Sequence, residues 1–564
     1  MAQPLDRRAF LVGSGRAAVA AAGVAGSGAL LAACSSSGGK TGGGQQTPAA
    51  NAGVSTAQPK RGGKLRVGVG SEIDGFDPAS NHWDQTGHTY AVCIYDSLAN
   101  YGADLKVKPY LAKSIEHNAD YTEWTIVTRA GIKFHDGEQL DAAAVKTNLD
   151  RSIASPLTGS ALANVAAVQV TAPDTVVVKM KSPWVPFDTY LVPGSQLGYM
   201  VSPKAIEGGK VSTAPVGTGP FVFQEWKVGD HFTATRNQSY WRSGLPYLDT
   251  VTFRPIPDSQ ARGNSLRAGD IDVMYGSTAQ NIVDFRNDKN VTYVDDMNST
   301  LGEPTLVFFM VNTAVPPVDD IRVRQAMAYA TDQEKLVKVA GLGVGLQFLP
   351  ITGPFDKGSP YYARTSYPAK PDLAKAKSLV QDYVKDKGSA PKFKLGTTND
   401  PTNVQNTQLV QAMWRAAGLD VDIDVVEQAS YITNALVGSY QVYGWIQFGA
   451  SDPDQNFVWW SQDTVAPVGS LSLNFARNKD PQIQAALEKG RASSKSSDRA
   501  AAYQTVMSRL ADDLPFIWAS RSVGSAMARP NVMNFVNPTL PDSDSGPALT
   551  GYHGLVYPAS TWLA

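Results

Sequence analysis

The sequence predicts an α/β protein of several domains, with a β-rich first half and an alternating α/β second half. Three observations support this fold class. The chain has 564 residues, which is too long for one hydrophobic core. Strand-like segments rich in Val, Ile and Thr gather between Trp124 and Lys181. From Asp319 onwards, segments with helical and strand periodicity alternate. A cleft between such lobes is the usual place for a small ligand.

The composition excludes some classes of function. Hydrophobic residues make up 43% and charged residues 18%, as in an ordinary soluble protein. Lys and Arg total 50 and Asp and Glu total 51, so no net field attracts nucleic acid, and we expect no nucleic-acid partner. Cys93 lies in the apolar segment Ala91–Tyr95, which favours a small buried hydrophobe over a nucleophile.

The first 33 residues are expected to be a removable signal peptide. Asp6-Arg7-Arg8-Ala9-Phe10-Leu11 resembles a twin-arginine export signal, and Leu31-Ala32-Ala33-Cys34 resembles a lipobox. A membrane span is the alternative, but the intervening stretch is short and rich in Gly. Because Arg-Arg pairs also occur in general secretory signals, the export route stays open. We expect acylated Cys34 to anchor the protein to the outer face of the cytoplasmic membrane.

Residues 34–62 are expected to form a flexible linker. They are mainly Ser, Gly, Thr, Gln, Ala and Pro, which cannot bury enough apolar surface to offset the entropy of ordering. Gly38-Gly39-Lys40-Thr41 echoes a phosphate-binding loop, but no strand precedes it and the first Gly of that motif is missing. The linker therefore predicts a tethered body rather than a nucleotide site.

The body begins with an alternating strand, Lys64–Val69, and Val92–Leu98 reads as the apolar side of a helix. Asp141 is placed to cap a helix that runs to about Ser152. Gly217-Thr218-Gly219-Pro220 predicts a turn before a strand at Phe221–Phe223.

The second half predicts longer helices. One begins at Asp319 or Asp320 and continues to Ala340, and another runs from about Asp480 to Asp513. Between them, Asp372 opens a helix that ends near Gly388. A βαβ unit follows, with strands around Phe393–Leu395 and Val421–Val425 on either side of a helix from about Thr402 to Ala417.

Several blocks, in order along the chain, resemble the extracellular solute-binding proteins of the peptide/nickel ABC importer family. They cover roughly residues 63 to 535 and lie behind the lipobox. The most specific are Gly131-Ile132-Lys133-Phe134-His135-Asp136-Gly137, Pro215-Val216-Gly217-Thr218-Gly219-Pro220-Phe221, Ala268-Gly269-Asp270-Ile271-Asp272-Val273, and Asp320-Ile321-Arg322-Val323-Arg324-Gln325-Ala326-Met327.

The resemblance implies a three-domain, type II periplasmic-binding-protein fold. Domain I would comprise 63–107, 214–303 and 521–564, domain II the β-rich insert 108–213, and domain III 304–520. The chain would cross between two lobes near Glu303–Asn312 and near Pro515–Ser525, and these crossings would form the hinge. The ligand would lie between the lobes.

No constellation of residues predicts an enzyme. The histidines are His82, His88, His117, His135, His231 and His553, and no pair has metal-ligand spacing on a helix. His82 and His88 are close enough in sequence to share a loop, but a metal role there is the weaker interpretation. We therefore expect no catalytic residue, no cofactor and no bound metal.

The candidate ligand-binding residues are Trp83, Trp445, Phe448, Gly449 and Asp452. Aromatic walls give apolar contact at low entropic cost, although the same residues would serve equally as core. In peptide-binding relatives this region resembles Trp-x-x-Asp, whose Asp pairs with the α-ammonium of the peptide. Phe448 or Gly449 occupies that place here, so the resemblance leaves a requirement for a free amino terminus in doubt.

We therefore expect a monomeric lipoprotein that captures oligopeptides or peptide-like solutes and delivers them to the permease subunits of an ABC importer. The alternatives keep the fold and change the ligand to a metal chelate, a glycan or an amine-blocked peptide. A secreted lipoprotein without a transport role is a further alternative.

Overall fold

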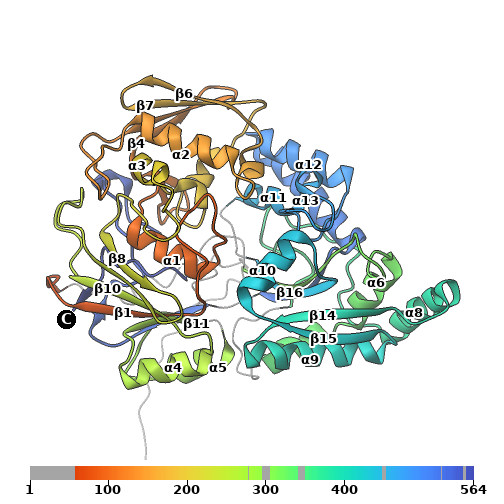
Figure 1. The fold of residues 1–564 in the computed structure, drawn as a ribbon. Coiled ribbons are helices and arrows are strands. Elements are labelled where there is room, and N and C mark those ends of the chain that lie inside the picture. The colour runs from red at the N-terminus through yellow and green to blue at the C-terminus, as the bar shows by residue number, and fades with distance from the viewer. Residues whose placement is uncertain are drawn as a thin grey trace, which may run out of the picture. The chain divides into compact units, whose positions relative to one another are not determined.

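The first predicted strand, β1 (Lys64–Val69), lies inside a seven-stranded sheet with the order β12-β18-β11-β1-β10-β9-β8. β1 is parallel to both of its neighbours, and the other pairs in the sheet are antiparallel. This sheet is drawn from distant parts of the chain (Figure 1): β8 (Phe221–Lys227), β9 (His231–Arg236), β10 (Thr250–Pro255), β11 (Val273–Gly276), β12 (Thr292–Val294) and β18 (Ser525–Ala528).

The predicted β-rich segment lies between the parts of that sheet, and its strands are antiparallel. Its four strands have the order β4-β5-β7-β6, and α2 (Ala142–Ala154) connects β5 to β6 by way of a short 3-10 turn. The strands are β4 (Ala112–His117), β5 (Glu123–Thr128), β6 (Val165–Ala172) and β7 (Thr175–Met180). Two short ladders lie outside the larger sheets: β2 (Ala99–Tyr101) with β3 (Val107–Pro109), and β19 (Val532–Met533) with β20 (Trp562–Leu563).

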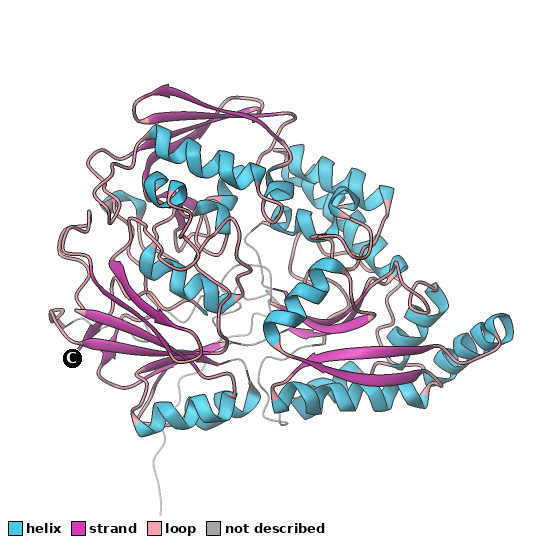
Figure 2. Ribbon diagram, viewed as in Figure 1, coloured by secondary structure: helices cyan, strands magenta, loops and turns pink. Residues whose placement is uncertain are grey.

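The second half of the chain builds a five-stranded mixed sheet with the order β15-β14-β16-β13-β17. The predicted βαβ unit is confirmed, because β14 and β15 are parallel neighbours joined by α9 (Pro401–Ala416), which packs on both strands. Figure 2 shows α9 running along this sheet. The strands are β13 (Leu306–Val311), β14 (Lys392–Thr398), β15 (Asp420–Val426), β16 (Val442–Gln447) and β17 (Phe516–Arg521).

The computed structural model describes residues 57–276, 278–294, 305–340, 350–447, 452–521, 524–549 and 554–564. All of them belong to one unit, Thr47–Ala564. The predicted signal peptide, Cys34 and most of the predicted linker lie outside the described residues, as do Phe448 and Gly449.

Several predicted helix caps are present. Asp141 accepts a hydrogen bond from the backbone N–H of Ala144, and Asp372 accepts one from that of Lys375. Gly388 ends the second of these helices in the left-handed conformation, with φ of 81°. The helix between Asp372 and Gly388 is α8 (Leu373–Lys387), and other helices are α3 (Pro203–Glu207), α4 (Ser259–Ala268), α5 (Ala279–Arg286) and α10 (Gln428–Val437).

The first helix differs from the prediction. α1 is Gln85–Ile94 rather than Val92–Leu98, because Asp84 accepts hydrogen bonds from the backbone N–H groups of Thr86 and Gly87 and starts the helix earlier. Tyr95 is extended and ends it. The apolar residues after Ile94 are therefore core residues outside the helix, and Leu98 is fully buried there.

Both long helices predicted in the second half are interrupted. The first divides into α6 (Ile321–Ala330) and α7 (Gln333–Ala340), because Thr331 is extended and its hydroxyl donates to the carbonyl of Met327. Asp332 then caps the new helix at Lys335. The second divides into α12 (Pro481–Ala492) and α13 (Ser496–Asp513) at Ser493, which is also extended.

The chain passes twice between the seven-stranded and the five-stranded sheets. It leaves the first after Val294 and enters the second at Leu306, so the first crossing lies ahead of most of the predicted segment Glu303–Asn312. It returns between Arg521 and Ser525, within the predicted segment Pro515–Ser525. The assignment of residues to three domains stays a prediction.

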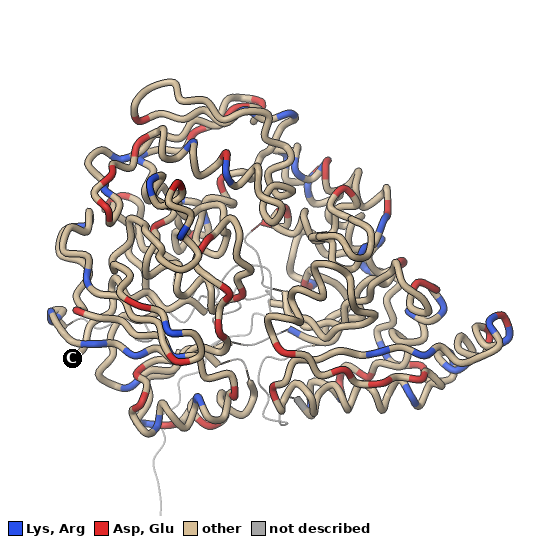
Figure 3. The backbone as a smooth tube through the Cα atoms, in the orientation of Figure 1, with Lys and Arg blue, Asp and Glu red and all other residues tan. Residues whose placement is uncertain are grey.

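The described residues agree with the compositional expectations in two respects. Cys93 is fully buried, and burial raises the pKa of its thiol well above the ordinary value. Lys and Arg are interspersed with Asp and Glu along the described chain (Figure 3). No helix in the described ranges is long and apolar enough to cross a bilayer.

Candidate functional site: a cavity at the strand ends

A cavity of about 680 Å³ is lined by elements of the seven-stranded and five-stranded sheets. Its lining includes the carboxyl end of β1, the first turn of α1, the end of β14 and the first turns of α9 and α10. The carboxyl ends of parallel strands are a common binding position in α/β proteins. The segment Gly194–Leu197, which follows the four-stranded sheet, adds to the lining.

One wall carries Trp83, immediately before α1. Its indole N–H donates to the carbonyl oxygen of Gly75 at 2.9 Å, and its ring meets Tyr199 edge-on at 5.9 Å. Gly87 makes this position possible, since a Cβ there would stand 2.5 Å from the Trp83 ring. The ring is therefore held in place before any ligand arrives.

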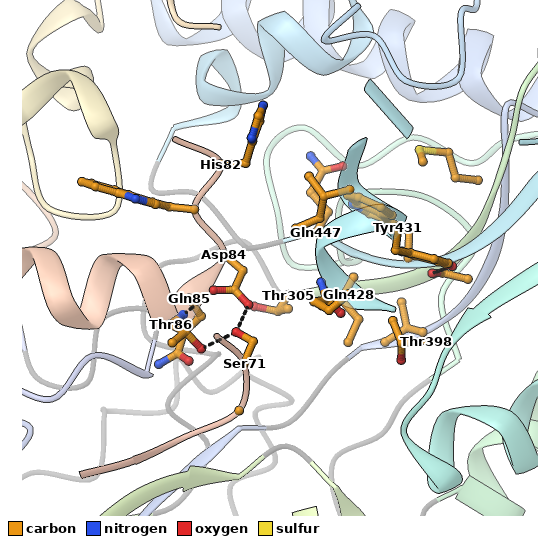
Figure 4. A pocket seen from close by; sticks show the side chains of 18 of the residues that line it. Ser71, His82, Asp84, Gln85, Thr86, Thr305, Thr398, Gln428, Tyr431 and Gln447 are labelled. Atoms are coloured by element: carbon orange, nitrogen blue, oxygen red, sulfur yellow. Dashed lines mark hydrogen bonds between the residues drawn. The ribbon is translucent and has the colours of Figure 1, made fainter. Parts of the chain in front are cut away.

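Asp84 lies on the same wall and is the single acidic residue among the described lining residues. Its carboxylate accepts hydrogen bonds from the Ser71 hydroxyl at 2.7 Å and from two backbone N–H groups at the start of α1 (Figure 4). Burial raises the pKa of Asp84 above its ordinary value, and these hydrogen bonds oppose the rise. The carboxylate thus serves first as a helix cap.

The opposite wall is built from aromatic rings of the five-stranded sheet. Trp445 in β16 stacks on Tyr431 of α10, with ring centroids 5.9 Å apart and an interplanar angle of 12°. Phe475 meets Trp445 edge-on at 5.3 Å. The Tyr431 hydroxyl donates to the carbonyl oxygen of Gly444 at 2.6 Å, which fixes the ring that supports Trp445.

Neutral polar groups are placed between the aromatic surfaces. Gln428, Gln447 and Thr398 project from the side opposite Asp84 (Figure 4). Asn403 and Gln455 also line the cavity. Amide and hydroxyl groups both donate and accept hydrogen bonds, so this lining suits a solute with amide or hydroxyl groups of its own.

The lining also includes a histidine. His82 is part of it, and its Nδ1 lies 2.8 Å from the carboxylate of Asp74. Within the described residues, no group of three or more His, Cys, Asp or Glu side chains is arranged to hold a metal.

The structure brings two of the predicted site residues together, since Trp83 and Trp445 both line the cavity. Asp452 does not line it: its carboxylate pairs with Arg499 and caps a 3-10 turn at Asp454. Phe448 and Gly449 lie outside the described residues.

Sequence reasoning missed two charged lining residues, Asp84 and Arg262. Asp84 carried a usable signal, because an Asp directly before a helical segment is a typical N-cap. Arg262 carried none, since nothing local distinguishes it from the other arginines of the chain.

Comparisons with known proteins agree with this geometry. The model of the family "Bacterial extracellular solute-binding proteins, family 5 Middle" matches residues 106–466. The chain is 32% identical over 324 residues to the glutathione-binding protein GsiB of Salmonella paratyphi A, a match that covers 56% of this chain and 60% of the relative. The chain therefore spans less than two thirds of the length of that relative.

Two solved structures share the fold over most of their length. The periplasmic binding protein AgaA of A. tumefacien R10, in complex with agropinic acid, is 25% identical, with a TM-score of 0.76 and coverage of 89% of this chain and 99% of that one. DppA of Helicobacter pylori, in complex with the peptide STSA, is 22% identical, with a TM-score of 0.77 and coverage of 89% and 98%.

The strand topology, the cavity at the strand ends and the family match lead to one conclusion. The chain has the periplasmic-binding-protein fold and belongs to the bacterial extracellular solute-binding proteins of family 5.

Proposed function

We propose that the protein captures oligopeptides or peptide-like solutes in this cavity and delivers them to the permease subunits of an ABC importer. The observation that carries the proposal is the lining itself, in which the aromatic faces of Trp83 and Trp445 flank neutral amides such as Gln428 and Gln447. Aromatic faces accept varied side chains, while amides match the repeating peptide group.

The amino-terminal end of such a peptide has little to hold it. Asp84 already accepts three hydrogen bonds, and Asp452 is paired with Arg499. A buried ammonium without its own carboxylate is costly by several kcal/mol. The cavity therefore suits amine-blocked peptides as well as free ones.

Native mass spectrometry of the purified protein tests the proposal directly, because closed binding proteins can retain their solute. A retained peptide or peptide derivative is the expected result. A metal chelate or a glycan would contradict the peptide assignment and keep the transport role.

Calorimetry on a peptide and its N-acetylated form then tests whether binding requires a free amino terminus. Acetylation is expected to change the affinity less than about tenfold, because the described lining has no uncommitted carboxylate that could pair with the ammonium. A hundredfold loss would instead assign the ammonium to Asp84 and would contradict the tolerance of amine-blocked peptides.

We also propose that the mature protein is a monomer anchored through Cys34. The lipobox-like Leu31-Ala32-Ala33-Cys34 supports the anchor, and two acyl chains give stable membrane attachment where one is marginal. Cys34→Ser should release the protein from the membrane fraction or stall its processing. Normal cleavage and membrane retention of Cys34→Ser would contradict the lipid anchor.

A further inference from the structure

Arg262 is a buried cation in the cavity wall, and no carboxylate of the described residues pairs with it. Its residue exposure is 7%, and it is the single Lys or Arg among the described lining residues. Nη1 donates to the carbonyl oxygens of Ile256 and Pro257, whereas Nε is buried without a hydrogen-bond partner. Among the described residues, the guanidinium forms no ion pair within 4.0 Å. Guanidinium groups stay charged, so this burial is unfavourable as it stands.

The fold brings this guanidinium to the end of β1. Arg262 lies in α4, and its side chain passes over the glycines that alternate with the valines of β1. A Cβ at Gly68 would stand 3.3 Å from Cγ of Arg262, and one at Gly70 would stand 3.7 Å from Nη1. Gly70 and Arg262 both line the cavity. The two glycines therefore provide the space in which the arginine reaches it.

The carboxylates whose charges act on the pKa of Arg262 already serve as helix caps. Burial lowers the pKa of Arg262, and the charges of Asp400 and Asp258 oppose that change. Asp400 caps α9 and Asp258 caps α4, each through backbone N–H groups. Neither carboxylate forms an ion pair with Arg262 among the described contacts.

We propose that Arg262 is the anchor for a carboxylate of the ligand. A carboxylate entering from the cavity can accept a charge-assisted hydrogen bond from Nη2, which makes no hydrogen bond among the described contacts. This inference rests on the proposed capture of peptide-like solutes and narrows it to solutes with a carboxylate. Trp83 and Trp445 then contact the apolar part of the same solute.

The test compares two pairs of probes that differ only in the carboxylate. Tri-alanine and its carboxyl-terminal amide form one pair, studied by calorimetry, and benzoate and benzamide form the other, studied by thermal shift. In the wild-type protein, tri-alanine is expected to bind at least about tenfold more tightly than its amide. Arg262→Gln should reduce this ratio to less than about threefold.

Arg324→Gln is the matched control. Arg324 is also a buried arginine, at 8% exposure, and it donates to the carbonyl oxygens of Asp513, Val318 and Asp319 away from the cavity. Its substitution should lower stability and leave the acid-to-amide ratio unchanged. The ratio thus separates a binding role of Arg262 from a structural one.

Each outcome decides one of the two proposals. If acid and amide bind the wild-type protein equally, the anchor is refuted and peptide capture stands. If neither peptide binds but benzoate, unlike benzamide, raises the melting temperature and Arg262→Gln abolishes that rise, the anchor stands and peptide capture fails. If no probe acts, both fail.

If Arg262→Gln does not fold, a crystal structure of the wild-type protein with tri-alanine tests the same assignment without a variant. The peptide carboxylate is expected within about 3 Å of the guanidinium nitrogens. A carboxylate bound anywhere else in the cavity would overturn the assignment.

Discussion

Trp445 is the residue of the five-stranded sheet that we expect to contact the solute. It is half-buried, lines the cavity and rests on Tyr431. Trp445→Ala should weaken solute binding by about 10- to 100-fold, because an aromatic side chain buried against a ligand contributes roughly 1–3 kcal/mol. Calorimetry with the solute recovered from the protein measures this loss.

Trp414→Ala is the contrasting variant. Trp414 is fully buried behind the sheet, 5.3 Å from the ring of Phe309, and its removal should cost about 3–5 kcal/mol of unfolding free energy. The free energy of unfolding of Trp445→Ala should lie within about 1 kcal/mol of the wild-type value. A large loss of stability in Trp445→Ala would make it a core residue instead.

Asp188 makes stability depend on pH. Burial, with a smaller contribution from the charge of Asp452, raises the pKa of its carboxyl from 3.8 to about 6. An acid whose pKa is raised by folding stabilises the native state below pH 4, and that contribution is lost as the pH rises to about 6. Asp188→Asn should therefore raise stability at pH 8 by at most about 3 kcal/mol, and by nothing at pH 3.5.

Thermal melts across this pH range measure the effect. Glu116→Gln, at an exposed position of β4, is the control for the loss of one carboxylate. An equal gain for Asp188→Asn at both pH values would show that the amide acts through packing and not through the proton.

At the level of elements, the end of α10 couples a helix cap to the cavity wall. Gly438 ends the helix with φ of 72°, and a Cβ there would stand 2.3 Å from Cζ of Arg477. The Arg477 guanidinium donates to carbonyl oxygens of four residues, among them Leu436 and Phe475, which line the cavity. Gly438 thus leaves the space that this arginine needs.

Gly438→Ala should therefore lose more unfolding free energy than Gly388→Ala. Gly388 ends α8 with φ of 81°, but a Cβ there would meet nothing within 4 Å, so its substitution costs only the backbone strain of roughly 1 kcal/mol. Displacing Arg477 should add about 1–3 kcal/mol, because carbonyl groups lose their donor. Equal melting temperatures of the two variants would contradict this coupling.

At the level of the whole molecule, hydrogen bonds to the buried residue Asp454 join the segment after the four-stranded sheet to the second half of the chain. Asp454 pairs with Arg491 at 2.9 Å and accepts a hydrogen bond from the Trp184 indole at 2.8 Å. The Tyr190 hydroxyl donates to the backbone carbonyl of Asp454. All four residues are buried.

Ligand binding should make the molecule more compact. The chain passes twice between the seven-stranded and five-stranded sheets, and both contribute to the cavity. A ligand contacted from both sides stabilises the closed form and shifts the population toward it. Small-angle scattering should show a smaller radius of gyration at saturation, starting from protein refolded without ligand. An unchanged radius would count against hinge closure.

The sequence by itself determined the parts of this protein that depend on local patterns. Alternation in Lys64–Val69 predicted β1, Asp141 and Asp372 predicted helix starts, and the ordered blocks from Gly131 to Met327 predicted the family. These signals are local because a cap or a pleat involves residues within a few positions of each other.

Only the tertiary structure decided where helices are interrupted and which residues share the cavity. Thr331 ends α6 through contacts that periodicity does not encode, and Gln333 restarts a helix while bonding the distant carbonyls of Ile351 and Trp518. Arg262 meets Gly70 across nearly two hundred positions of sequence, and Trp83 faces residues of β16 on the other wall. Such neighbours are set by the packing of sheets, so no local sequence pattern predicts them.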